Sequence, residues 1–216
     1  MTLPERLAQY NASEGAEEYL DEYTKFHRKL SDKREHKLLD RYFARIGQIE
    51  SALDLPCGWG RYMPYLSEHG AKVLEADYSG SMVRKVAEVF PKAELLGRMR
   101  CFGHRIPLQD RAVALAFSMR LSHHLADPQV RREHIQELFR VADRWAIFSY
   151  FDTASLKNKI RVVRTKMGLS KKHPKNTLGR QEVRTMAAEA GWEVLEDPML
   201  FVIGSGHRIV LARRKG

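Results

Sequence analysis

Residues 51–65, with the sequence SALDLPCGWGRYMPY, decide the fold that we predict for this chain. Residues 52–55, with the letters ALDL, are apolar at three positions in four, as in a strand buried on both faces. The chain then turns through Gly58 and Gly60 and enters a segment, 61–69, that Gly70 closes in the manner of a C-cap glycine. Strand, glycine turn and helix in this order open a nucleotide-binding α/β unit.

The glycine turn predicts close contact with a ligand. Glycine lets the backbone approach a ligand and adopt φ > 0 at little steric cost, and the helix N-terminus behind it offers free N–H groups to an anionic group. A dinucleotide fingerprint would need a third glycine where this chain has Met63. A glycine turn also closes many βα units that bind nothing, so other residues must decide between these interpretations.

Asp54 stands at the end of the predicted strand and opens the run D-x-P-C-G-x-G. This run resembles motif I of the class I S-adenosylmethionine-dependent methyltransferases (methyltransferase type 11-like), in the variant where proline replaces the first glycine. The resemblance implies that S-adenosylmethionine is the cofactor. It also implies that the cofactor contacts the strand end and the turn, at Asp54, Leu55, Pro56, Cys57, Gly58 and Gly60.

A second match follows the next apolar strand, predicted over 71–76. Asp77 lies at its end, 17 residues after Gly60 and close to the roughly 20 that separate a glycine loop from a ribose-binding acid. A carboxylate there accepts hydrogen bonds from both ribose hydroxyls. Ser79 is predicted to cap a helix that ends before Pro91. The run D-Y-S-G-S-M resembles the family's D-x-S-x-x-M, which implies cofactor contacts from Asp77, Tyr78 and Met82.

The chain departs from the family pattern after the third predicted strand, 93–96. Similar methyltransferases place an aspartate in the following loop to bind the adenine amine. Here the loop 97–107 is rich in arginine, and the first acid after it is Asp110. Phe102 stands near the expected place, and the resemblance implies that it holds adenine by stacking.

The fourth predicted strand, 112–118, runs into the letters S-M-R-L-S-H-H-L. This resembles the end of strand 4 in the same family, which implies that Ser118 and Met119 approach the methionine part of the cofactor. His123 is a candidate general base, because histidine titrates near neutral pH and this edge of an α/β sheet binds ligands. A histidine that only packs or caps the turn explains the residue equally well.

The fifth predicted strand, 145–151, leads to two further candidate bases, Tyr150 and Asp152. The family's architecture implies that they face the transferred methyl from the substrate side. After them, terminal glycines and apolar patterning predict one helix and two strands, and the resemblance implies that these strands are the antiparallel pair that closes the fold. These elements are expected at 179–191, 192–196 and 201–212.

A long cationic segment follows the fifth strand. Residues 153–181 contain no aspartate or glutamate, and their nine lysines and arginines nearly equal the chain's net charge of +10. We predict that 153–180 is a substrate-side insert that grips phosphate groups, with a solvated basic loop as the common alternative. Few aromatic residues separate the cations, which disfavours single-stranded nucleic acid, where bases stack.

Composition restricts the remaining possibilities. The net charge of +10 and the pI near 9.7 favour an anionic partner such as RNA, a phosphorylated substrate or an acidic membrane surface. No apolar run approaches the roughly 20 residues of a membrane span, and the N-terminal stretch lacks the apolar core of a signal peptide. Cys57 and Cys101 are too few for a disulfide framework or a zinc site. We therefore predict a cytoplasmic protein without a bound metal.

The N-terminal part of the chain, residues 1–47, precedes the first predicted strand and is predicted to be a helical arm. Its tyrosines either pack on the sheet, as aromatic rings commonly do, or line a lid over the substrate. Two helices, 16–30 and 33–46, carry apolar residues at helical spacing, with Ser31 or Asp32 as the N-cap of the second.

Together these features predict a Rossmann-like α/β fold of the class I methyltransferase type. We expect a seven-stranded, mostly parallel sheet with an antiparallel last strand and helices on both faces. Residues 48–216 would form the S-adenosylmethionine-binding domain. The predicted reaction is methyl transfer to an O or N atom of an anionic small molecule or glycoconjugate. An RNA methyltransferase and a non-catalytic cofactor- or partner-binding module of the same fold remain alternatives.

Overall fold

The computed structural model describes residues 26–169, 176–201 and 205–216. In this part of the chain, five parallel strands form the centre and one side of a sheet: β1 (Ser51–Asp54), β2 (Lys72–Asp77), β3 (Leu95–Arg100), β4 (Val113–Ser118) and β5 (Ala142–Phe151). Antiparallel pairing adds β6 (Trp192–Glu196), β7 (Met199–Phe201) and β8 (Ser205–Arg214). The strand order is β3-β2-β1-β4-β5-β8-β6, and β7 pairs with β8.

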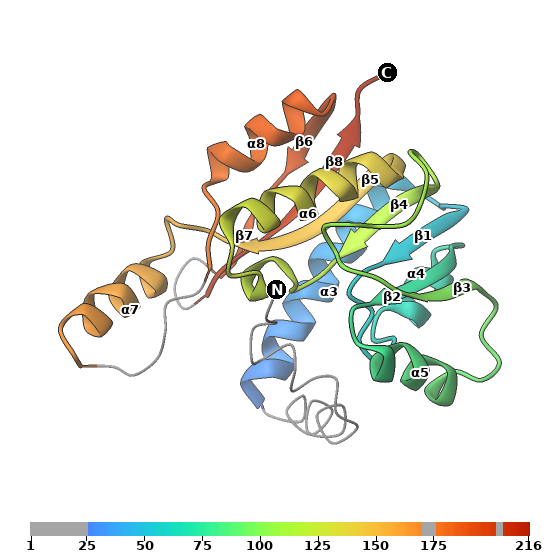
Figure 1. Cartoon of the computed structure of the whole chain (residues 1–216), viewed down its shortest axis with the longest axis horizontal. Helices are drawn as coiled ribbons and strands as arrows, with labels where there is room; N and C mark the ends of the chain where they lie inside the picture. Colours follow the sequence, from blue (N-terminus) through green and yellow to red (C-terminus); the bar gives the residue numbers. More distant parts are fainter. Residues whose placement is uncertain (1–25, 170–175, 202–204) are drawn as a thin grey trace.

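Helices cover both faces of this sheet (Figure 1). They are α3 (Phe26–Ile46), α4 (Met63–Glu68), α5 (Gly80–Val89), α6 (Pro128–Val141), α7 (Leu156–Lys166) and α8 (Arg180–Glu189), with a short 3₁₀ turn, η1 (Ser122–His124). One apolar core lies between the sheet and α6 and α8, and a second lies between the opposite face and α3 and α4. Because β4 lies between these layers, all six of its residues are buried.

The predicted fold class is confirmed, with one strand more than expected. The sequence predicts a single long strand over 201–212. In the structure the chain forms the three-residue β7 first and then reverses, so that β7 lies antiparallel beside β8. The central strands are parallel and the closing strands are antiparallel, as predicted.

The N-terminal helices differ from the prediction. The sequence predicts a break at Ser31 or Asp32, but α3 runs through both residues. The Asp32 carboxylate pairs with Arg61 of the glycine turn, and the apolar side of α3 is buried against the sheet. Tertiary contacts therefore hold the helix continuous through a sequence that locally favours a cap. Residues 1–25 lie outside the described residues. They include most of the first predicted helix, 16–30, and about half of the predicted arm, 1–47.

The third strand also differs from the prediction. A strand over 93–96 followed by a loop was expected, whereas β3 extends from Leu95 to Arg100 and pairs in parallel with β2. Its residues alternate between half-buried and exposed, so the two arginines, Arg98 and Arg100, lie on the exposed side. An edge strand needs only one apolar face, which is why arginines do not end it.

Several local predictions are confirmed. The Ser79 hydroxyl caps α5 and accepts a hydrogen bond from the Met82 amide at 3.4 Å. Beyond the end of α8, Gly191 has a φ of +77°, as a glycine that closes a helix does. Among the described residues, no helix is long and apolar enough to cross a membrane.

Candidate active site

The glycine turn after β1 has a defined shape. Gly58 and Gly60 have φ values of +56° and +87°, which favour glycine. A Cβ atom at Gly60 would lie 3.0 Å from the Phe90 ring, so packing requires glycine there. A Cβ atom at Gly58 would meet nothing within 4 Å. The Gly58 backbone therefore borders open space at the carboxyl edge of the sheet, where α/β sheets bind ligands.

The residues between strand and turn continue the hydrogen bonding of the sheet. The Leu55 amide donates to the Phe117 carbonyl at 3.0 Å, and the Cys57 amide donates to the Ala76 carbonyl at 2.8 Å. The Leu55–Pro56 peptide bond is cis. Burial raises the pKa of the Cys57 thiol well above its usual value, and neighbouring carboxylates raise it further. Cys57 is therefore a neutral thiol at pH 7 and no nucleophile.

Asp77 ties the end of β2 to the glycine turn. Its Oδ2 accepts a hydrogen bond from the Gly58 amide at 3.0 Å, and its Oδ1 accepts one from the Ser79 amide at 2.8 Å. Burial raises the pKa of Asp77, and the hydrogen bonds from these amides act in the opposite direction. A carboxylate has about four acceptor positions, so Asp77 can hold the turn and still accept from a ligand hydroxyl.

A fully buried carboxylate, Asp54, lies at the end of β1 beside this turn. No hydrogen-bond donor in the described part of the chain contacts either of its oxygens. It pairs in register with Glu75, which is also buried. Burial and the neighbouring carboxylates Glu75 and Asp77 raise the pKa of Asp54 well above its usual value. A buried carboxylate without a donor is costly, so the site favours a ligand with a cationic group.

The helix behind the turn is shorter than predicted. The sequence predicts a segment over 61–69, whereas α4 has six residues, Met63–Glu68. The Met63 amide donates to the Gly60 carbonyl at 3.2 Å, and the Leu66 amide donates to the Tyr62 carbonyl at 2.9 Å. The expected row of free N–H groups is therefore partly used within the turn, and we assign no anion to it.

An aromatic pair stands beside Asp77 at the same edge. The rings of Tyr78 and Phe102 lie 4.8 Å apart, and Phe102 is 45% exposed. The Arg100 guanidinium lies 5.3 Å from the centre of the Tyr78 ring. An exposed aromatic surface next to the proposed ribose-binding acid suits a stacked base. Met82, the other residue predicted in this region, is buried in α5.

The end of β4 holds a residue that the sequence did not single out, His134 of α6. Ser118 and Met119 are buried, and the Ser118 hydroxyl lies 3.1 Å from Nε2 of His134. The other ring nitrogen of His134, Nδ1, lies 2.9 Å from the Gly103 carbonyl oxygen. Burial lowers the pKa of His134 to about 4, so the ring is neutral at pH 7. Nδ1–H must then donate to Gly103, and Nε2 accepts from Ser118.

The three predicted bases differ in their surroundings. His123, in η1, is half-buried, and its ring lies 4.8 Å from the Phe151 ring. Tyr150 is fully buried, which raises the pKa of its hydroxyl. Asp152 is 1% exposed and forms an ion pair with Arg208 at 2.5 Å. Only His123 combines partial exposure with a position at the carboxyl edge of the sheet.

Residues 53–148 match the family model of the methyltransferase domain. The match begins in β1 and ends in β5, so it contains the glycine turn, Asp77, the aromatic pair and His123. The chain carries a class I S-adenosylmethionine-dependent methyltransferase domain. S-adenosylmethionine is accordingly the cofactor of this methyltransferase, and the buried Asp54 carboxylate fits its cationic character.

Solved structures share the fold of the methyltransferase. The magnesium protoporphyrin IX methyltransferase from Synechocystis PCC 6803, with bound S-adenosylhomocysteine, is 18% identical, with a TM-score of 0.68 and 88% of each chain covered. The PH0226 protein from Pyrococcus horikoshii OT3 is 16% identical, with a TM-score of 0.67 and coverage of 90% of this chain and 94% of that one.

A third similar structure contains an acceptor as well. The 1,6-didemethyltoxoflavin-N1-methyltransferase from Burkholderia thailandensis, with bound 1,6-didemethyltoxoflavin and S-adenosylhomocysteine, is 14% identical. The TM-score is 0.64, and the match covers 100% of this chain and 92% of that one. No curated protein matches the sequence of the methyltransferase.

A buried ion cluster fastens α3 to the glycine turn and to the loop after β4. Glu35 of α3 is fully buried. Its carboxylate accepts from Arg61 at 2.9 Å and from Arg120 at 2.8 Å, and it also accepts from the Tyr62 hydroxyl. Sequence reasoning missed this cluster, because a glutamate within a charged helix gives no sign of being buried.

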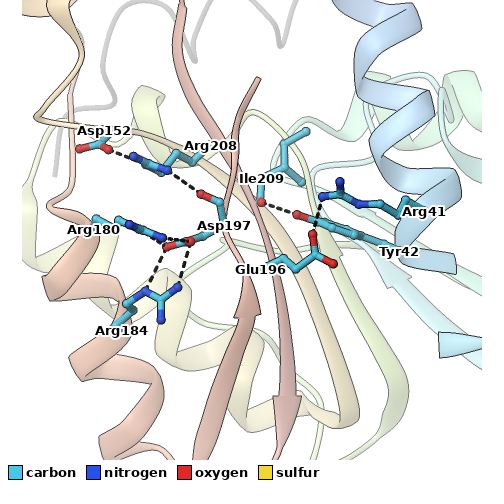
Figure 2. A network of polar contacts seen from close by, with 9 residues as sticks. All are labelled: Arg41, Tyr42, Asp152, Arg180, Arg184, Glu196, Asp197, Arg208 and Ile209. Carbon is cyan, nitrogen blue, oxygen red and sulfur yellow. Dashed lines mark hydrogen bonds and ion pairs between the residues drawn. The ribbon is translucent and has the colours of Figure 1, made fainter. Parts of the chain in front are cut away.

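A second network holds the end of β5 against the closing strands (Figure 2). Arg208 donates to the Asp152 carboxylate and, at 2.6 Å, to the Asp197 backbone carbonyl. The Asp197 carboxylate accepts from Arg180 and Arg184 of α8 at 2.7 and 2.9 Å. Burial alone would raise the pKa of Asp197, but the two guanidiniums lower it to about 2. Asp152 thus belongs to a structural network.

Proposed function

We propose that the methyltransferase transfers a methyl group from S-adenosylmethionine to an O or N atom of an anionic small molecule or glycoconjugate. The observation that supports this most directly is the cationic segment after β5. Its described parts contain no acid, and none of the five lysines and arginines of α7 forms an ion pair with another described residue. Unpaired cations that follow the carboxyl end of β5 favour an acceptor with phosphate or carboxylate groups.

The cofactor would be held at the edge that carries the glycine turn. When bound, S-adenosylmethionine supplies an already activated methyl group. In this proposal the cationic cofactor favours the ionised form of the Asp54 carboxyl, whose pKa is otherwise raised by burial. Asp77 accepts hydrogen bonds from the ribose hydroxyls, and Tyr78 and Phe102 contact adenine. The other predicted contacts around them are Leu55, Pro56, Cys57, Gly58, Gly60, Met82, Ser118 and Met119.

The chain has little further chemistry to perform, because in-line positioning supplies most of the acceleration of such a transfer. Where the acceptor atom is a hydroxyl oxygen or an amine nitrogen, its proton must leave as the methyl group is transferred. We assign the removal of this proton to His123, which is half-buried at the carboxyl edge of the sheet. Tyr150 and Asp152 are weaker candidates, since the first is fully buried and the second is ion-paired with Arg208.

Matched pairs of acceptors test the proposal. Each phosphorylated or carboxylated compound is offered beside its neutral analogue, with S-adenosylmethionine carrying a radioactive methyl group. We expect methyl incorporation into the anionic member at a kcat/KM at least about tenfold higher, which corresponds to about 1.4 kcal/mol. Equal rates for both members would refute an anionic acceptor.

A second candidate, methylation of RNA, is favoured by the net charge of +10. It predicts RNA binding whose log affinity falls linearly with the log of the salt concentration. Binding of the cofactor without turnover on either acceptor class would instead indicate a non-catalytic module. Cofactor titration, acceptor turnover and RNA binding together separate the three possibilities.

A further inference from the structure

The exposed apolar side chains of the described residues are concentrated in and just after α7. Eight large apolar side chains are exposed, and five of them lie between Leu156 and Leu169, with exposed fractions from 50% to 65%. Single exposed apolar residues are common on soluble proteins, whereas a continuous group marks an interaction surface. Figure 1 shows α7 at the side of the sheet, away from the helices that cover its faces.

The spacing of these residues places them on one side of the helix. Leu156, Ile160, Val163 and Met167 follow one another at intervals of four, three and four residues, which defines a single apolar stripe. Cations flank this stripe on both sides: Lys157 and Arg164 on one, Lys159 and Lys166 on the other. We call this surface the α7 stripe.

The remaining positions show how α7 is oriented. They are the only half-exposed residues of the helix, and at helical spacing they form the side opposite the stripe: Asn158, Arg161, Val162 and Thr165. The α7 stripe therefore points away from the rest of the methyltransferase that the structure describes.

The base of α7 is fixed to the sheet. Ser155 is its N-cap and is buried, and its hydroxyl accepts a hydrogen bond from the Asn158 amide at 3.4 Å. It packs so closely on Gly206 of β8 that a Cβ atom at that glycine would lie 2.1 Å from Ser155 Cβ. This anchor gives the stripe a defined direction relative to the sheet.

We propose that α7 docks the methyltransferase on an anionic lipid bilayer. An interfacial helix places its apolar stripe at the boundary between headgroups and acyl chains, while flanking lysines and arginines contact the lipid phosphates. The α7 helix has five cations and no acid, so its charge complements an anionic membrane surface. This inference goes beyond the proposed reaction and does not depend on it.

Other partners explain only part of the surface. A soluble anionic acceptor or RNA accounts for the cations and leaves the apolar stripe without a role. A second copy of the chain would cover the stripe but would bring two sets of like charges together, which is unfavourable. An anionic bilayer accounts for both features at once. Because α7 follows the carboxyl end of β5, docking would hold the glycine-turn edge of the sheet near the lipid headgroups.

Co-sedimentation of the full chain with vesicles tests the proposal without cofactor or acceptor. We expect binding to vesicles of phosphatidylcholine with about 30% phosphatidylglycerol, and binding at least about tenfold weaker to pure phosphatidylcholine. The apolar variant, Ile160→Ser with Val163→Ser, should bind the anionic vesicles at least about tenfold more weakly. The cationic variant should lose a similar factor; it carries Lys157→Gln, Lys159→Gln and Lys166→Gln.

Matched controls use residues with the same chemistry elsewhere on the surface. Val89→Ser with Leu96→Ser removes two other exposed apolar side chains, and Lys72→Gln, Lys92→Gln and Lys215→Gln removes three other exposed cations. Both controls should bind vesicles like the wild type. All changed residues are exposed, so circular dichroism and thermal unfolding should confirm that every variant folds.

Four results would overturn the proposal. One is no binding to anionic vesicles, and another is equal binding to neutral ones. A third is an apolar variant that binds like the wild type while the cationic variant does not, which would indicate a polyanion such as RNA. The fourth is an apolar variant that changes only the oligomeric state, which would indicate a second copy. Since no turnover is measured, failure here leaves the proposed methyl transfer standing.

Discussion

The Asp77 carboxylate, at the end of β2, accepts a hydrogen bond from the amide of Gly58 in the glycine turn, over 3.0 Å. One side chain thus joins the two sequence motifs that predict the cofactor site, the glycine turn and the run that begins at Asp77. It does so beside the open space over Gly58. Because Asp77 both shapes the turn and has acceptor positions left over, it is the residue through which cofactor binding is tested most directly.

Replacing Asp77 by alanine should weaken the binding of S-adenosylmethionine at least about tenfold, or about 1.4 kcal/mol. The variant loses the ribose acceptor and the hydrogen bond that holds Gly58. Isothermal titration calorimetry with S-adenosylmethionine and with S-adenosylhomocysteine measures the effect. Glu94→Ala, a change at an exposed acid on the way to β3, is the control and should bind both compounds like the wild type. Unchanged affinity in Asp77→Ala would contradict the proposed cofactor site.

The candidate base His123 should affect turnover rather than cofactor binding. His123→Gln is expected to lower kcat by about 100-fold, the lower range for loss of a general base, with an unchanged Kd for S-adenosylmethionine. Asp152→Asn should instead lower the melting temperature, because it leaves Arg208 without its carboxylate partner. If Asp152→Asn reduced kcat at full stability while His123→Gln did not, the roles of the two residues would have to be exchanged.

Loss of the buried charge at Glu35 should destabilise the fold. Glu35→Gln leaves Arg61 and Arg120 without a carboxylate, and removing one partner of a buried ion cluster costs about 3 kcal/mol. Urea unfolding monitored by circular dichroism measures the change in the free energy of unfolding. Glu88→Gln is the control, since Glu88 is exposed and pairs with Lys85 at the surface, where such a pair contributes less than about 1 kcal/mol. Equal effects of both changes would rule out a special role for the cluster.

His134 should make stability depend on acidic pH. Above pH 6.5 the ring is neutral in both states, and between pH 6.5 and about 4 only the unfolded chain binds the proton. The free energy of unfolding should therefore fall as the pH falls through this window, by up to about 3 kcal/mol from this residue. The slope should be reduced in His134→Gln. An NMR titration gives a direct check: a His134 ring that titrates near pH 6.5 in the folded protein would exclude this account.

Glu75 should act in the opposite direction. Burial raises the pKa of Glu75 to about 8, with a further contribution from Asp77. Between pH 4.5 and about 8 the folded chain keeps a proton that the unfolded chain releases, so stability falls as the pH rises. In Glu75→Gln this loss is absent, and the variant should gain stability relative to the wild type as the pH rises from 5 to 8. Unfolding in urea at several pH values measures the difference, and a constant difference would contradict the raised pKa.

Much of the architecture follows from short-range patterns. The turn after β1 needs glycine because its φ values are positive, and the Ser79 cap of α5 acts within three residues. Both effects depend on local backbone geometry, which neighbouring letters encode. The mostly parallel sheet with antiparallel closing strands followed from apolar patterning together with the family resemblance, whereas the order of the strands within the sheet is a finding of the structure. The proposed cofactor contacts and bases, by contrast, remain predictions that the experiments above test.

Only the tertiary structure decided those features that depend on contacts between residues far apart in the sequence. Asp32 could serve as a cap in isolation, yet it pairs with Arg61, and α3 continues. Residues 97–100 were expected to begin a loop, but they continue β3, because an edge strand tolerates arginines on its exposed face. Glu35 and His134 acquire their roles only because residues far along the chain meet them in a buried, poorly solvated place. Burial and long-range pairing arise from packing, and no local pattern in the sequence records them.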